Sequence, residues 1–126
     1  IIKKAKNTKD KHELISRFQV AELAKEVEKI TIKTNECFLT RDETTIGEIF
    51  VLNKSIKNKT DDAIHNIVGE MKVNSKAVVS GTNLVIVLKH LERISEHCTN
   101  IAENVFFMIN AKIIKHEKFE EKKSGE

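Results

Sequence analysis

The sequence predicts an all-α protein, an antiparallel up-down-up bundle of three long helices. Proline is absent and only four glycines occur in 126 residues, so the chain lacks the turn signals that separate the strands of an all-β protein. Apolar residues instead recur every three or four positions through three long segments, which is the spacing of one helix face. A hydrophobic content of 40% in a chain of this length is enough for the core of one domain.

The first two predicted helices are joined by a polar turn. The first should run from about His12 to Leu39, and its buried stripe consists of Val20, Leu23, Val27, Ile30, Thr34 and Cys37. Thr40 followed by Glu43 fits a capping box, in which each side chain accepts from the other residue's backbone amide. A second helix should therefore begin near Arg41 and end near Met71, and its core positions are Ile46, Ile49, Ile56, Ala63 and Ile67.

The third predicted helix has the clearest apolar pattern. It follows a short connection in which either Asn74 or Ser75 can serve as the N-cap. Its expected seam has heptad-like spacing and consists of Leu84, Val87, Leu91, Ile94, Cys98, Ile101, Val105 and Met108. Short connections between helices, each about 45 Å long at about 1.5 Å per residue, require antiparallel neighbours.

Charge and composition argue against several classes of function. The 22 basic and 19 acidic residues are interleaved and every aromatic residue is Phe, so the chain has neither the basic face nor the stacking platform typical of nucleic-acid binders. No apolar run approaches the roughly 20 residues that cross a bilayer. Cys37 and Cys98 lack metal-site spacing, and we expect them to be reduced, buried thiols.

An acidic stripe on the third helix is the candidate metal site. Glu92, Glu96, Asn100 and Glu103 are spaced by four, four and three residues, which places them on one helix face. We expect this face to lie opposite the seam. Its oxygen atoms suit magnesium, manganese, calcium or iron. The alternative is an ordinary solvated face, with Lys89 and Arg93 neutralising part of the charge.

The sequence contains no pattern that indicates catalysis. Nucleophile elbows, phosphate-binding glycine loops and HExxH sequences are all absent. His90 and His97 lie on the flank of the expected seam, where an interface role is favoured over metal ligation. The chain is therefore expected not to be an enzyme.

The segment HLERISEHCTNIAENVFFMINAKIIKH, from His90 to His116, resembles the motif that closes a PhoU domain, approximately LERIGDHATNIAE followed by an aromatic-aliphatic stretch and a basic-His pair. Lys115 and His116 match that terminal pair. The other matching positions are Leu91, Glu92, Arg93, Ile94, His97, Thr99, Asn100, Ile101, Ala102 and Glu103.

This resemblance implies a domain layout. PhoU proteins carry two three-helix bundles in tandem, and Ile1 to Lys6 looks like the end of a preceding bundle. We therefore expect residues 1–11 to be a helix tail and linker, residues 12–117 the PhoU-like bundle, and residues 118–126 a charged, disordered tail. Because Ile1 is not an initiator Met, we expect the sequence to be a fragment, with any localisation signal upstream.

The resemblance also implies a function. It indicates a cytoplasmic negative regulator of phosphate homeostasis that couples a phosphate transporter ATPase to a sensor histidine kinase and meets the membrane only through these partners. It further implies metal clusters on surface acidic pairs, with Glu92 and Glu96 as ligands. Glu96 replaces the family's usual Asp and Ser95 its Gly. The acidic pair expected on the second helix is replaced by Asn53 and Lys57, and Lys57 is placed to bridge to Glu92 or Glu96.

Two alternative functions and a possible self-association accompany this interpretation. The chain could be the regulatory PhoU-like domain of a sodium-phosphate cotransporter, or a metal-binding helical domain. Phe18, Phe38 and Phe50 fall outside the main apolar stripes, which favours a homodimer.

Overall fold

The structure is a computed structural model that describes residues 8–124. It consists of α1 (Thr8–Thr40), α2 (Glu43–Val73), a 3-10 turn η2 (Ser75–Ala77) and α3 (Val78–Ser124). Three long helices and no strand are found in this part of the chain, which confirms the all-α, three-helix prediction.

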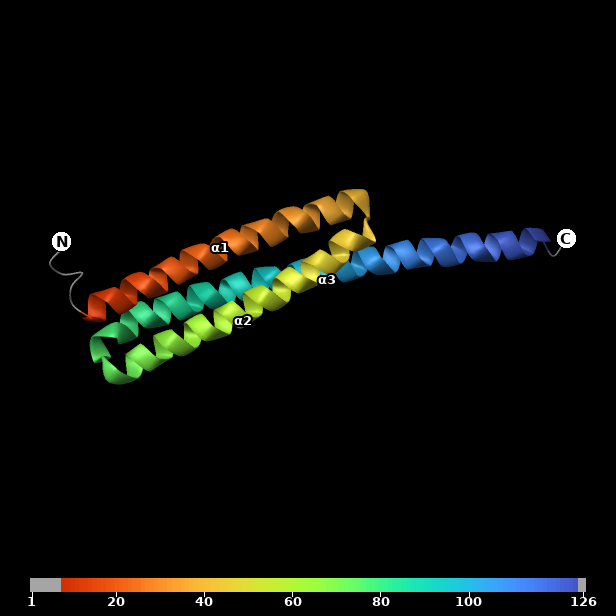
Figure 1. Cartoon of the computed structure of the whole chain (residues 1–126). Coiled ribbons are helices and arrows are strands. Elements are labelled where there is room, and N and C mark those ends of the chain that lie inside the picture. Colours follow the sequence, from red (N-terminus) through yellow and green to blue (C-terminus); the bar gives the residue numbers. More distant parts are fainter. Residues whose placement is uncertain (1–7, 125–126) are drawn as a thin grey trace.

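The three helices lie side by side in the predicted up-down-up order (Figure 1). Two cross-helix hydrogen-bonding contacts, Glu13 with Ser80 and Thr31 with Cys98, both join residues 67 positions apart. Because the sequence separation is the same in both pairs, a step forward along α1 matches a step forward along α3, so these two helices are parallel. The intervening helix α2 is therefore antiparallel to both. The C-terminal part of α3 projects beyond the ends of the other two helices (Figure 1).

The helix bounds extend beyond the predicted ones. α1 begins at Thr8, so it includes residues that were expected to form a linker, and α2 ends at Val73 instead of Met71. α3 continues to Ser124, through most of the expected tail. The predicted helix tail, Ile1 to Lys6, lies outside the described residues.

The predicted capping box between α1 and α2 is wrong. Thr40 is the last residue of α1, and its hydroxyl donates back to the Glu36 carbonyl at 2.9 Å. Asp42 caps α2 instead, accepting from the Thr44 amide at 3.0 Å. A carboxylate at this position is also favoured by the helix dipole, so the cap is displaced by two residues.

The turns at the two ends of the bundle are short. Arg41 has a φ of 55° and its amide donates to the Cys37 carbonyl at 2.7 Å, which ends α1 in the left-handed conformation. At the other turn, Asn74 accepts from the Lys76 amide at 3.2 Å. Asn74 was one of the two predicted caps, and it caps the 3-10 turn that leads into α3.

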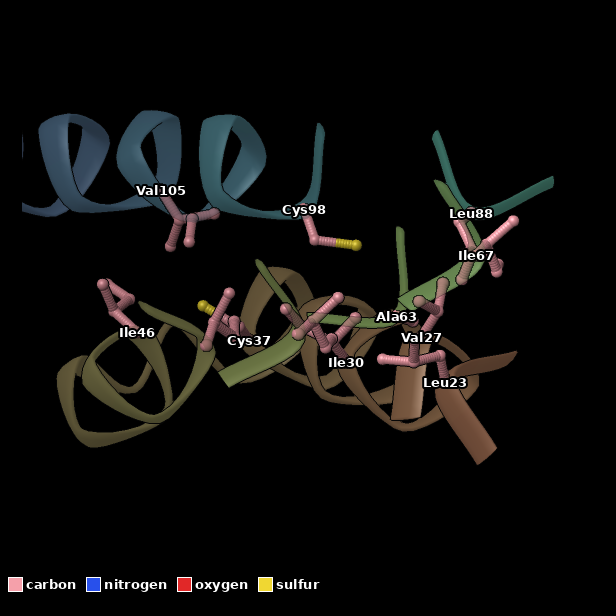
Figure 2. Close-up of a cluster of buried hydrophobic side chains, with 13 residues drawn as sticks. Leu23, Val27, Ile30, Cys37, Ile46, Ala63, Ile67, Leu88, Cys98 and Val105 are labelled. Carbon is pink, nitrogen blue, oxygen red and sulfur yellow. The ribbon is translucent and has the colours of Figure 1, made fainter. Parts of the chain in front are cut away.

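The core lies along the common axis of the three helices (Figure 2). Figure 2 shows Cys98 and Val105 of α3 pointing toward Ile30, Cys37 and Ile46. The predicted stripes of α1 and α2 are confirmed. The buried hydrophobic residues are Leu23, Val27, Ile30, Cys37, Ile46, Ile49, Ile56, Ala63, Ile67, Leu88, Cys98, Ala102 and Val105.

The predicted seam of α3 is half wrong. Cys98 and Val105 are buried, and Leu84 and Leu91 pack against the core. The other half is 40–44% exposed and consists of Val87, Ile94, Ile101 and Met108. Their place in the core is taken by Leu88, Ser95 and Ala102, which are fully buried. The buried face of α3 is therefore rotated about its axis relative to the prediction.

No helix in the described part of the chain is long and apolar enough to cross a membrane.

Thr60 carries a buried hydroxyl that lacks a hydrogen-bond partner. An unsatisfied buried hydroxyl costs about 1–3 kcal/mol, and valine has nearly the same shape. Thr60→Val should therefore raise the free energy of unfolding by about 1 kcal/mol or more, measured by urea denaturation. Thr34→Val is the control, because the buried Thr34 hydroxyl donates to the Ile30 carbonyl at 2.7 Å. Equal losses in both variants would contradict the prediction.

Candidate functional site

One member of the predicted acidic stripe, Glu92, does not lie opposite the core. The side chain of Glu92 is 14% exposed, whereas Glu96, Asn100 and Glu103 are exposed. This correction follows from the rotation of α3. Because Ser95 and Ala102 face the core, the Glu92 carboxylate, one turn before Ser95, lies at the edge of the buried face of α3.

Glu92 has an incompletely satisfied carboxylate. Its Oε1 lies 3.9 Å from the Lys89 ammonium nitrogen, within ion-pair range but too far for a hydrogen bond. Its Oε2 is buried and has no hydrogen-bond partner. This oxygen is the feature of the stripe best suited to receive a cation or a hydrogen-bond donor.

A hydrogen bond joins α3 to α2 next to this carboxylate. The Ser95 hydroxyl donates to Asn53 Oδ1 at 2.7 Å. Ser95 is fully buried and Asn53 is half-buried, so the bond is largely shielded from water. A buried hydroxyl needs a partner, and the Asn53 amide supplies it across the helix interface.

Lys57 lies one helical turn beyond Asn53. Because α2 and α3 are antiparallel, one turn forward on α2 corresponds to one turn back on α3, which is the level of Glu92. Lys57 is exposed, and among the described residues it forms no ion pair with Glu92 or Glu96. The structure pairs Glu92 with Lys89 instead.

The described side chains do not bring enough metal-ligating groups together for a metal cluster. Among the side chains that the structure describes, no three from His, Cys, Asp or Glu are grouped closely enough to hold one metal ion. Metal binding by Glu92, Glu96, Asn100 and Glu103 stays a prediction. His90 and His97 are both exposed on α3.

The two cysteines are free and buried, as the sequence predicted. Burial raises the pKa of the Cys37 thiol above its ordinary value, and the nearby Asp42 carboxylate raises it further. A buried thiol with a raised pKa is a poor nucleophile and a poor metal ligand, so Cys37 serves packing.

Large exposed apolar side chains occur on all three helices. Phe18, Phe38 and Phe50 are exposed, as expected from their positions outside the stripes. Self-association through them stays a prediction. The sequence did not indicate the exposed column of Val87 and Ile94, because heptad spacing had assigned it to the core. It also did not indicate the Ser95–Asn53 pair. The only sign of it in the sequence was that Ser95 replaces the family's Gly and that Asn53 replaces an expected acidic residue.

The Ser95–Asn53 hydrogen bond should contribute measurably to stability. Hydrogen bonds typically contribute about 0.5–1.5 kcal/mol, so Ser95→Ala and Asn53→Ala should each destabilise the chain and be less than additive when combined. A double-mutant cycle by urea denaturation should give a coupling energy near about 1 kcal/mol. Full additivity would mean that water replaces the bond without loss.

These features define a class of protein: a helical-bundle domain with broad helix surfaces and no catalytic motif in its sequence. The chain matches the profile of the family described as "PhoU domain" over residues 20–105. This is more than half of the chain, so the chain belongs to that family. The match ends at Val105, the last buried hydrophobic residue in the described chain.

A curated relative supports the same assignment. The chain is 24% identical over 98 residues to "Phosphate-specific transport system accessory protein PhoU homolog" of Pseudomonas aeruginosa. The aligned region covers 78% of this chain and 40% of the relative, so the chain spans less than half of the relative's length. No solved structure matches the chain.

Proposed function

We propose that this chain is part of a negative regulator of phosphate uptake, an adaptor that couples a phosphate ABC transporter to a sensor histidine kinase. The observation that carries the proposal is the PhoU domain match, which spans the packed part of the bundle. The relative named as a phosphate-specific transport accessory protein supports it. The proposal concerns the whole protein, because the chain corresponds to 40% of that relative.

The surface of the bundle supports binding to proteins in preference to catalysis. Exposed apolar side chains such as Phe18, Leu39 and Phe107 are 65%, 73% and 63% exposed. Side chains of this size on a helix surface are suited to contacts with another protein. An adaptor needs such surfaces and no reacting group.

The test is a deletion of the gene in its own host, with a reporter for genes induced by phosphate starvation. In phosphate-replete medium the deletion should raise reporter expression, and the full-length gene should restore repression. Deletion of the histidine kinase as well should abolish the increase, because the adaptor acts through the kinase. An unchanged reporter in the single deletion would contradict the proposal.

A physical test complements the genetic one. The full-length protein should co-purify with the transporter ATPase and the histidine kinase from phosphate-replete cells. Recovery of neither partner, with the bait present at its normal level, would count against the adaptor mechanism even if the reporter responds.

A further inference from the structure

We propose that the Ser95–Asn53 hydrogen bond provides the polar contact between α2 and α3, and that the packing of these two helices does not require a metal cluster shared between them. Resemblance to the PhoU family implies metal clusters on acidic pairs. The residues of this chain do not fit a cluster that spans both helices, so its fold should be independent of metal.

The α2 side of the contact lacks the required ligands. Asn53 contributes a neutral amide, and its Oδ1 already accepts the Ser95 hydroxyl at 2.7 Å. Hard divalent cations in proteins are usually held by one or more carboxylates. Asn53 therefore offers neither a negative charge nor an uncommitted oxygen lone pair in the direction of Ser95.

The next turn of α2 adds a repulsive charge. Lys57 stands at the level of Glu92 in the antiparallel register, and its side chain is exposed. An ammonium group has the same charge sign as a metal ion, so a lysine at this level disfavours a cation beside the Glu92 carboxylate even without an ion pair to it. Lys89 is on α3 itself, and its ammonium nitrogen, 3.9 Å from Glu92 Oε1, disfavours a cation there in the same way.

The α3 side alone supplies an incomplete site. The buried Oε2 of Glu92 is the one atom that fits a cation, but Glu96, Asn100 and Glu103 are exposed. No group of three charged or thiol ligands forms in the described chain. A cation attracted to this stripe would be held by α3 alone and would not link the two helices.

The test measures the melting temperature of the chain, first with a chelator and then with Mn²⁺, with elemental analysis of the purified protein alongside. The wild-type Tm should change by less than about 1 °C in either condition, since a ligand stabilises a fold only by binding it. A lower Tm in chelator and a clear rise in Mn²⁺ would overturn the proposal.

A gain-of-site variant tests the cause. Asn53→Asp with Lys57→Glu places two carboxylates on α2 opposite Glu92 and Glu96. The new carboxylate at position 53 still accepts the Ser95 hydroxyl, so the contact is kept. Mn²⁺ should raise the Tm of this variant by about 5 °C or more. A folded variant without any response to Mn²⁺ would overturn the assignment of these two positions.

A matched control separates the site from the change in charge. Lys54 and Asn58 are both exposed on α2, also four residues apart. Lys54→Glu with Asn58→Asp makes the same two replacements at exposed positions outside the Ser95–Asn53 contact, and its Tm should not respond to Mn²⁺. If the site variant does not fold, Lys57→Glu alone leaves the Ser95–Asn53 bond intact and should show a smaller response. An equal response in the control would overturn the proposal.

Discussion

Leu88→Ala is expected to lower the free energy of unfolding by about 2–5 kcal/mol, whereas Val87→Ala should cost less than about 1 kcal/mol. The Leu88 side chain is 0% exposed and Val87 is 42% exposed. Truncation at position 88 removes buried methyl groups and leaves a cavity that the surrounding helices fill only in part. Truncation at position 87 removes atoms that already contact water.

The measurement is equilibrium unfolding in urea, with the slope compared between variants to verify that the same surface is exposed. The two substitutions are adjacent on α3, so their positions along the helix are alike. Replacing the β-branched Val87 by Ala also improves helix propensity, which lowers its expected cost further. The expected difference of several kcal/mol is a large share of a typical total of about 5–15 kcal/mol. A larger loss of unfolding free energy in Val87→Ala than in Leu88→Ala would instead support the buried face of α3 that was predicted from the sequence.

This pair of residues shows why the sequence predicted the helices but not the orientation of α3. One column, with Leu84, Leu91, Cys98 and Val105, belongs to both possible seams. The second column lies either three residues later, at Val87, Ile94 and Ile101, or four residues later, at Leu88, Ser95 and Ala102. Hydrophobicity favours the first choice, since it contains larger apolar side chains.

Packing favours the second choice. Ser95 and Ala102 are small, so the backbone of α3 can approach the other helices closely, and the Ser95 hydroxyl finds a partner in Asn53. A sequence pattern records the polarity of a side chain and not the space available to it. Periodicity therefore fixed the number and direction of the helices, while the rotation of α3 depends on contacts between helices.

The same reason limits what the sequence could say about the candidate site. Its helix, its spacing and the residues Glu92 and Glu96 follow from the chain itself. Whether the Glu92 side chain faces solvent or is largely buried depends on the rotation of α3, and the structure leaves it 14% exposed. The N-cap of α2 was misplaced on a smaller scale, because Thr40 and Asp42 are both good N-cap residues and only the chain path selects between them.

Ile30→Asp is expected to destabilise the bundle by about 5 kcal/mol or more at neutral pH, enough to unfold most of a marginally stable domain. Ile30 is 0% exposed and lies in the C-terminal half of α1. The substitution removes buried apolar area and places a carboxylate among the apolar side chains of the core. Ile32→Asp, on the same helix but 61% exposed, is the matched control and should stay folded.

The pH dependence identifies the cause of this loss. Burial raises the pKa of the introduced carboxyl above its ordinary value of about 3.9. The destabilisation should therefore be greatest above the raised pKa and should diminish as the pH falls and the group becomes neutral. A loss that is equal at all pH values would indicate that the cavity, not the charge, dominates.

The same two variants connect the fold to the proposed function. Introduced into the full-length gene, Ile32→Asp should restore repression of the phosphate-starvation reporter in the deletion strain, and Ile30→Asp should not. Protein levels measured by immunoblot separate loss of the adaptor by degradation from loss of activity. Repression by a stable protein carrying Ile30→Asp would mean that regulation does not require this bundle to be folded, and the adaptor surface would then have to lie elsewhere in the protein.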